Sequence, residues 1–315
     1  MKKKVISLFV TGMLAVSMIA GCGSDNTAAD TNTSADTTAD ASTDAADTTA
    51  EETPAATADF DASEYVNVLS REDGSGTRGA FIELFGIEEK DADGNKVDNT
   101  TEEAIITNST SVMLTTVAGD DYAIGYVSLG SLNDTVKALK IDGEEATEQN
   151  IKDGKYKICR PFNIATKKGA DNELAKDFIS YIMSKEGQQV ISDNGYIGDD
   201  SAEAYAGTKP SGKVVVGGSS SVSPVMEKLI EAYKKVNTGA AIELQTTDST
   251  TGMTSAIDGS YDIGMASREL QDDEKDKLDS QAIATDGIAV IVNKNNTTDA
   301  VSYTHLRAHE TGAYL

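Results

Sequence analysis

From Tyr65 onward, short apolar runs alternate with glycine-rich turns and with segments whose apolar residues recur at helical spacing. The apolar runs predict strands over residues 65–69, 122–127, 158–165, 213–216, 242–245, 261–265 and 282–293. The amphipathic segments predict helices over residues 78–85, 109–117, 174–183, 225–236 and 253–257. Such alternation is typical of an α/β fold whose sheets are parallel or mixed and flanked by helices.

The same alternation predicts that the folded part consists of α/β lobes. We expect one lobe over residues 64–160 and a second over residues 161–296. The chain should cross between the lobes near residues 161–166 and 283–293, which would form the hinge. A turn-rich joint at 207–212 precedes the strand at 213–216.

The first residues predict a targeting segment rather than a part of the fold. Lys2 to Lys4 precede an apolar stretch over 5–20, which predicts a secretory signal over residues 1–21. Residues 19–21, Ile-Ala-Gly, directly precede Cys22 and resemble a bacterial lipobox. The resemblance implies lipidation of Cys22 and a location outside the cytoplasm, anchored to the bacterial cell membrane. An ordinary signal or a membrane anchor is the alternative.

We expect two further segments to contribute nothing to the hydrophobic core. Residues 22–60 are rich in Asp, Thr, Ala and Ser and contain no Lys or Arg, which predicts a disordered acidic tether. Residues 297–315 contain both histidines, His305 and His309, and resemble a translated sequencing adapter. We interpret this stretch as a non-native tail that cuts the first lobe short, so that the true protein continues past Asn296; a genuine tail is the alternative.

Charge and composition narrow the possible functions. The 315 residues include 27 Lys+Arg against 52 Asp+Glu, a formal charge of −25, which argues against binding to nucleic acid. The two cysteines, Cys22 and Cys159, suit neither a zinc site nor a disulfide framework. We therefore expect no metal and no cofactor.

A hydroxyl-rich loop between a predicted strand and a predicted helix occurs three times along the chain. Ser75–Thr77, Ser219–Ser221 and Ser249–Thr251 each follow a predicted strand and precede a predicted helix. The first N–H groups of a helix lack internal partners and carry partial positive charge, so hydroxyls placed there favour anion binding. Helix capping alone explains any single loop; three together favour an anion site.

The loop from Arg71 to Thr77 carries the most chemical information. Arg71 offers a planar fork of donors to an oxyanion, while Ser75, Gly76 and Thr77 offer N–H and O–H groups. Asp73 is placed to hold the Arg71 guanidinium. The loop is not a P-loop, because it has no Gly-Lys-Ser/Thr ending.

Three segments together resemble the PstS family, the substrate-binding lipoproteins of phosphate-specific ABC transporters. They are Arg71–Thr77, the Gly-Ser-Ser-Ser-Val-Ser-Pro run that ends at Pro224, and Asp262–Leu270. The resemblance implies a two-lobed periplasmic-binding-protein fold of type II with a ligand cleft between the lobes. It implies a monomer that passes inorganic phosphate to an ABC permease. It also implies a set of phosphate ligands, namely Arg71, Ser75, Gly76, Thr77, Ser220, Ser221 and Ser249, with Ser267 nearby.

The chain departs from the family pattern in two ways. The Arg71 loop precedes the Ser219–Ser221 loop, whereas the family has the opposite order; a permuted gene, or a tail half fused to a second copy, would explain this. Arg268 stands where some members have an aspartate that accepts the phosphate proton. We therefore expect Arg268 to face the anion and Asp286 to accept that proton, with a turn or hinge aspartate as the alternative.

Two other functions compete with phosphate capture. A phosphatase or serine hydrolase would need a base beside Ser75 or Ser220, yet no histidine lies outside the suspect tail. The sequence therefore predicts that the protein is not an enzyme. A sensor or surface protein that binds an oxyanion without transporting it remains the second alternative.

Overall fold

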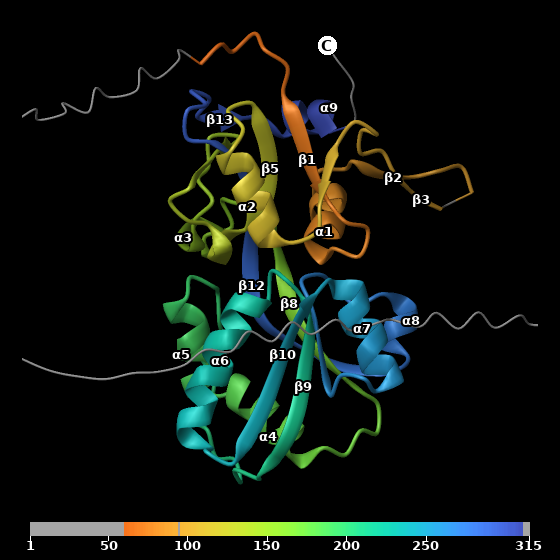
Figure 1. Cartoon of the computed structure of the whole chain (residues 1–315), viewed down its shortest axis with the longest axis vertical. Coiled ribbons are helices and arrows are strands. Elements are labelled where there is room, and N and C mark those ends of the chain that lie inside the picture. Colours follow the sequence, from red (N-terminus) through yellow and green to blue (C-terminus); the bar gives the residue numbers. More distant parts are fainter. Residues whose placement is uncertain (1–59, 94, 311–315) are drawn as a thin grey trace, which may run out of the picture. The chain divides into compact units, whose positions relative to one another are not determined.

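Figure 1 shows the computed structural model of the chain, which describes residues 60–93 and 95–310, the side chains of 308–310 excepted. The expected signal segment, Cys22 and the tether up to residue 59 lie outside the described residues, as do residues 311–315. None of the described helices is both long enough and apolar enough to cross a bilayer.

The main sheet of the described residues is mixed, and its strands follow the order β10-β9-β11-β8-β12-β5-β1-β4, with β6 also paired to β12. β1 pairs in parallel with β4 and β5, and β9 with β10 and β11, whereas β8 and β12 pair antiparallel with each other and their neighbours. The strands are β1 (Asn67–Arg71), β4 (Ile105–Thr107), β5 (Ala123–Ser128), β6 (Val136–Ala138), β8 (Cys159–Lys167), β9 (Gly212–Ser219), β10 (Ala240–Thr247), β11 (Ile263–Ala266) and β12 (Leu278–Asn293).

The long strand β12 divides the sheet into two halves. Its first part, Leu278–Gly287, pairs with β8, and its last part pairs with β5 and β6. We call residues 159–287 the Arg160 half, and residues 60–158 with 288–307 the Arg71 half. The pairing partner of β12 changes after Gly287, within the predicted crossing near 283–293, and the lobe bounds 64–160 and 161–296 stay a prediction.

Helices cover both faces of each half (Figure 1). In the Arg71 half, α1 (Gly76–Leu84) packs with Ile124 and Tyr126, whereas α2 (Thr110–Ala118) packs with Ala123 and Val127. These strand residues alternate along β5, so the two helices lie on opposite faces. The remaining elements of this half are β2 (Glu88–Lys90), β3 (Lys96–Asp98), η1 (Leu129–Ser131), β7 (Lys140–Ile141) and α3 (Glu148–Lys152).

In the Arg160 half, three helices share one apolar cluster with Val214 and Val216 of β9. They are α4 (Glu173–Ile182), α5 (Lys185–Asp193) and α6 (Ser223–Val236). α7 (Ser249–Asp258) packs through Met253 and Ala256 in a separate cluster on the other side, and is followed by α8 (Asp272–Lys275). Every helix and strand expected from the sequence is present, with ends shifted by a few residues.

Residues 297–307, which belong to the stretch expected to be a foreign tail, are part of the Arg71 half in the structure. β13 (Ala300–Val301) pairs in parallel with β7, and α9 (Tyr303–Glu310) follows it. Leu306 is buried in the core, and the Tyr303 ring lies 4.8 Å from the Phe85 ring. A short strand and a helix therefore follow Asn296 in this half. The interpretation of residues 297–315 as a non-native tail stays a prediction.

Candidate functional site

The N-termini of four helices meet where the two halves face each other. The Nη2 atom of Arg71 donates to the Ser220 hydroxyl at 3.1 Å, and the Thr77 and Ser221 hydroxyls lie 2.7 Å apart. The hydroxyl of Thr110, at the start of α2, lies 3.3 Å from both serine hydroxyls. Residues from α1, α2 and the loop before α6 thus form one buried polar network.

A second network lies beside the first, between α7 and the end of β11. The Ser219 hydroxyl donates to that of Ser267 at 2.9 Å, and the Ser267 N–H donates to the Ser249 hydroxyl at 3.1 Å. Gly76 is in close contact with both: a Cβ atom there would lie 2.4 Å from Ser249 Oγ and 2.8 Å from Ser267 Oγ. Only glycine lets the start of α1 approach this closely.

Arg160 of β8 joins the two networks. Its Nε atom donates to the carbonyl of Ser267 at 2.9 Å, and its Nη2 atom donates to the Thr77 hydroxyl at 3.0 Å. Its Nη1 atom lies 3.1 Å from a carboxylate oxygen of Asp286. Burial lowers the pKa of this guanidinium, while Asp286 acts in the opposite direction. The Asp286 carboxylate therefore compensates the positive charge of this buried guanidinium.

The guanidinium of Arg71 is only partly hydrogen-bonded. Its Nε and Nη2 atoms both pair with the Glu72 carboxylate at 2.8 Å. Its Nη1 atom is buried and has no hydrogen-bond partner among the described residues. Leaving a buried charged donor unpaired is costly, so this atom favours a negatively charged acceptor. The expected partner Asp73 is wrong, because its carboxylate pairs with Arg78 instead.

We refer to these buried groups as the hydroxyl cluster. It consists of Arg71, Thr77, Thr110, Arg160, Ser219, Ser220, Ser221, Ser249 and Ser267. Two other expected ligands adjoin it: Gly76 lies against it, and Ser75 caps α1 by accepting from the Arg78 N–H at 3.3 Å. Arg268 and Asp286 lie outside it.

Arg268 does not turn toward the cluster. Both of its terminal nitrogens pair with the buried carboxylate of Glu274 at 2.8 Å. The expectation that Arg268 binds the anion is therefore wrong for this geometry.

Asp286 lies behind Arg160. Its Oδ1 atom accepts from the Gly130 N–H at 3.3 Å, and its side chain is fully buried. Burial raises the pKa of this carboxyl to about 6, against the opposing effect of Arg160. No hydroxyl of the cluster is hydrogen-bonded to Asp286 within the described part of the chain. Its expected direct contact with the phosphate proton does not fit this placement.

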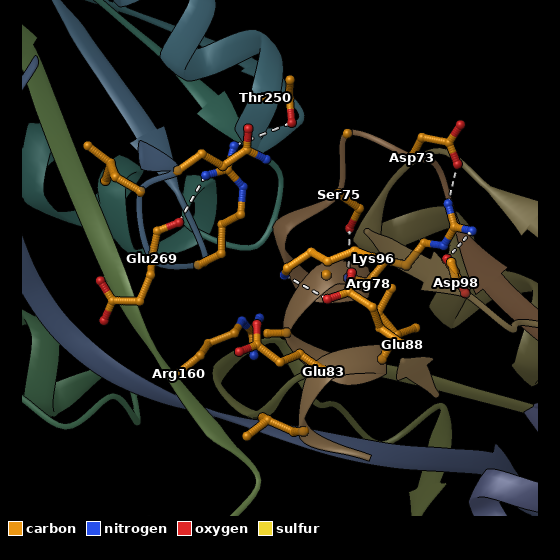
Figure 2. Close-up of a pocket in the computed structure, with 18 of the residues that line it drawn as sticks. Asp73, Ser75, Arg78, Glu83, Glu88, Lys96, Asp98, Arg160, Thr250 and Glu269 are labelled. Carbon is orange, nitrogen blue, oxygen red and sulfur yellow. Dashed lines mark hydrogen bonds and ion pairs between the residues drawn. The ribbon is translucent and has the colours of Figure 1, made fainter. Parts of the chain in front are cut away.

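A cavity of about 940 Å³ opens beside the cluster and is lined by both halves. Figure 2 shows Ser75 and Arg160 at its wall, together with several ion pairs. Arg78 pairs with Asp98 at 2.7 Å, and Lys96 pairs with Glu88 at 2.6 Å. Both of these cations are thus paired with carboxylates. The cavity adjoins the cluster at Ser75 and Arg160.

Sequence reasoning missed three members of the cluster: Thr110, Ser219 and Arg160. Thr110 follows a serine cap, the same signal that marks the three predicted loops. Ser219 belongs to a predicted loop but was not assigned a ligand role. The signal for Arg160 was a single arginine inside an apolar strand, where a charge requires a partner.

The cluster holds hydroxyls, arginines and backbone groups rather than metal ligands. In the parts of the chain that the structure describes, no three or more His, Cys, Asp or Glu side chains come close enough to hold a metal ion. Serine and threonine hydroxyls can donate to one anion oxygen and accept from a protonated one. The arrangement is therefore suited to a tetrahedral oxyanion enclosed between the halves.

Comparisons with known proteins agree with this arrangement. The profile of the PBP superfamily domain matches residues 25–186 and 203–308. The phosphate-binding protein PstS 2 of Streptococcus agalactiae is 52% identical over 313 residues, which cover 99% of this chain and 96% of the relative. PstS 2 of Streptococcus pneumoniae is 48% identical over 80% of this chain and 86% of its own.

A crystal structure supports the fold independently. That of a phosphate-binding protein of a phosphate ABC transporter from S. pneumoniae shares 48% identity and a TM-score of 0.63, over 79% of this chain and 96% of that one. Because one alignment runs through nearly all of the S. agalactiae relative, that protein has the same order of segments, and the permuted order is not peculiar to this chain. The chain belongs to the PBP superfamily and, within it, to the family of the phosphate-binding protein PstS.

Proposed function

We propose that this protein captures inorganic phosphate outside the cytoplasm and delivers it to the membrane subunits of an ABC transporter. The observation that carries this proposal is the buried Nη1 donor of Arg71, unpaired in a cluster of hydroxyls. The relatives named as phosphate-binding proteins support the choice of phosphate. Closure of the two halves on the anion would suffice for capture without chemistry.

The charge balance of the cluster fits an exchangeable ligand. Each arginine already has a carboxylate partner, Glu72 or Asp286, so an anion would be held mainly by oriented hydroxyl and N–H dipoles. Dipoles provide directional hydrogen bonds to all oxygens of a tetrahedral anion. We propose that Arg71, Ser75, Gly76, Thr77, Ser220, Ser221, Ser249 and Ser267 contact the phosphate, joined by Thr110, Ser219 and Arg160.

We also propose that the chain acts as a monomer anchored by a lipid on Cys22, and that it has no catalytic activity. In the described residues, no carboxylate or imidazole is hydrogen-bonded to the hydroxyls of the cluster, so none is placed to act as a general base. A non-transporting sensor would use the same cluster. It would differ only in its partner: a neighbouring permease gene would favour transport, and a fused or adjacent kinase would favour sensing.

The test is calorimetric titration of the chain from Glu64 onward with phosphate, arsenate, molybdate and sulfate. We expect tight binding of phosphate. Arg71→Lys should weaken it about tenfold to a hundredfold, because lysine cannot reproduce the guanidinium fork and a charged hydrogen bond contributes about 1.5–3 kcal/mol.

Arg78→Lys is the matched control, since Arg78 pairs with Asp73 and Asp98 outside the cluster. Its phosphate affinity should equal that of the wild type. Equal affinities for Arg71→Lys and the wild type would remove Arg71 from the site. Stronger binding of sulfate than of phosphate would replace phosphate as the ligand.

A further inference from the structure

A buried carboxylate lies behind the anion site at the crossing of the two long strands. Asp286 of β12 and Arg160 of β8 are direct cross-strand partners, in the segment where the chain passes between the halves. Neither side chain reaches solvent: Asp286 is 0% exposed and Arg160 is 2% exposed. Water therefore cannot screen the interaction between these two charges.

The surroundings of Asp286 only partly satisfy its charge. The Oδ1 atom accepts from the Gly130 N–H, but Oδ2 has no hydrogen-bond partner among the described residues, although it lies 3.1 Å from Arg160 Nη1. The Ser128 hydroxyl and the backbone N–H groups of η1 favour the ionised carboxylate. Incomplete pairing of a buried carboxylate favours its protonated form.

The other titratable groups that face Asp286 are few. Tyr196, which follows α5, packs against Gly130, and both burial and the Asp286 charge raise the pKa of its phenol. Burial likewise raises the pKa of the Cys159 thiol, the neighbour of Arg160 on β8. Both groups stay neutral at ordinary pH. Arg160 is therefore the one cation that Asp286 faces within the described residues.

The guanidinium of Arg160 is shared between Asp286 and the hydroxyl cluster. Its Nη1 atom faces Asp286, while Nη2 and Nε donate to Thr77 and to the carbonyl of Ser267. An anion in the cluster and the Asp286 carboxylate thus lie on opposite sides of one positive charge. Each negative charge weakens the attraction of Arg160 for the other, and the two also repel each other.

We propose that Asp286 is a positioning residue that couples anion binding to proton uptake: an anion bound in the hydroxyl cluster drives protonation of Asp286, which leaves the Arg160 charge to the anion. This inference rests on the proposed function, because it requires the anion to bind in that cluster. Asp286 itself does not touch the ligand.

The direction of the effect follows from linkage. Burial places the pKa of Asp286 at about 6, so above that pH the carboxylate is ionised in the free protein. A bound anion raises this pKa further, so binding above pH 6 takes up a proton. By reciprocity, affinity rises as the pH falls toward 6, and coupling between linked sites is typically 5–150-fold. We expect an effect on the order of tenfold.

The experiment compares the wild type with Asp286→Asn. Phosphate is titrated by calorimetry from about pH 5 to about pH 8, in two buffers with different ionisation enthalpies. Protonation of free phosphate is common to both proteins and cancels in the difference. The wild type should take up a larger fraction of a proton per anion than the variant. The affinity of the variant relative to the wild type should rise about tenfold between pH 5 and pH 8.

Asp177→Asn is the matched control. Asp177 is a buried carboxylate in the Arg160 half that accepts from the hydroxyls of Tyr205 and Tyr233, away from the cluster. This variant should show the proton uptake of the wild type, whatever its stability. Should Asp286→Asn fail to fold, carbon-13 NMR of Asp-labelled wild type gives the same information, as one carboxyl titrating near pH 6 should shift to higher pH when phosphate is added.

The outcomes separate the two proposals. If phosphate binds the wild type but proton uptake is the same in Asp286→Asn, and the affinity ratio is constant with pH, Asp286 only supports the fold and the coupling is overturned. A carboxyl that titrates identically with and without phosphate overturns the coupling as well. Absence of phosphate binding in the wild type would instead reject the proposed function, and the coupling with it.

Discussion

The two halves of the molecule are built from the same parts. Each contributes an arginine at the end or start of a strand, a carboxylate bonded to that arginine, and two helix N-termini with hydroxyl side chains. They differ in solvent access and in spare donors. Glu72, the partner of Arg71, is 22% exposed, and Arg71 retains an unpaired nitrogen. Asp286 is fully buried, and every nitrogen of Arg160 is engaged.

This difference distinguishes an arginine that mainly binds the anion from one that also stabilises the fold. A partly exposed ion pair such as that of Arg71 is screened, so its geometry can change at small cost when an anion arrives. A buried pair such as that of Arg160 is costly to break from either side. We infer that Arg71 mainly sets affinity, whereas Arg160 sets affinity and stability together.

The strongest test of this contrast is Arg160→Met. It leaves Asp286 buried without a cation, which costs about 3–5 kcal/mol of unfolding free energy. Phosphate affinity should fall about a hundredfold or more, because both networks lose their link. Urea denaturation and calorimetry measure the two effects.

Because Arg160 lowers the pKa of Asp286, the variant's carboxyl should have a pKa above the wild-type value of about 6, so the stability loss should shrink as the pH falls toward 6. A protein that keeps its wild-type stability and loses only affinity would place Arg160 with Arg71 as a ligand, and the contrast would fail.

Gly76→Ala tests how closely the two halves pack at the cluster while both arginines remain. The new methyl group would clash with the Ser249 and Ser267 hydroxyls, and overpacking costs about 1–3 kcal/mol, or about tenfold in affinity. The matched control is Gly79→Ala, because nothing lies within 4 Å of a Cβ there. Equal phosphate affinities for the two variants would argue against closure at Gly76.

Neutral donors should matter equally in both halves. Thr110→Val removes a hydroxyl from the Arg71 half, and Ser221→Ala removes one from the Arg160 half. Each should weaken phosphate about twofold to tenfold, since a neutral hydrogen bond contributes about 0.5–1.5 kcal/mol. A markedly larger loss in only one variant, measured by calorimetry, would mean that the halves differ in more than their arginines.

The smallest effect is expected for Arg268→Gln. Its guanidinium is committed to Glu274, so phosphate affinity should stay within about twofold of the wild type. Competition of phosphate with arsenate in a filter-binding assay is sensitive enough to detect a change. A tenfold loss would restore Arg268 to the site and add a third arginine to the comparison.

The hydroxyl loops could be predicted because their signal is local. A strand, a Ser/Thr-rich turn and a helix start lie within a dozen residues, and the first turn of the helix fixes where the hydroxyls point. That reasoning singled out Arg71, Thr77, Ser220, Ser221 and Ser249, which lie together in the cluster. It also placed Gly76 against the cluster, because close packing there requires glycine.

The errors arose where the answer depends on distant residues. Arg160 faces the cluster only because β8 pairs with β12, and its partner Asp286 is fixed by that register. Glu274 captures Arg268 from the following helix turn, and the exchange of Glu72 for Asp73 beside Arg71 depends on Arg78 in α1. Strand pairing and competition between neighbouring ions are tertiary features that no single segment reveals.

The shared strand β12 also has a consequence for how the chain acquires its structure during synthesis. The Arg160 half is one continuous stretch of sequence, whereas the Arg71 half must wait for Ile288–Val292, which pair with β5 from more than half the chain away. Closing so long a loop is entropically slow. A ribosome therefore releases residues 67–128 long before their last partner strand exists. The half that carries Arg71 should be the last to fold, and until then its strand β5 has an open edge exposed to aggregation.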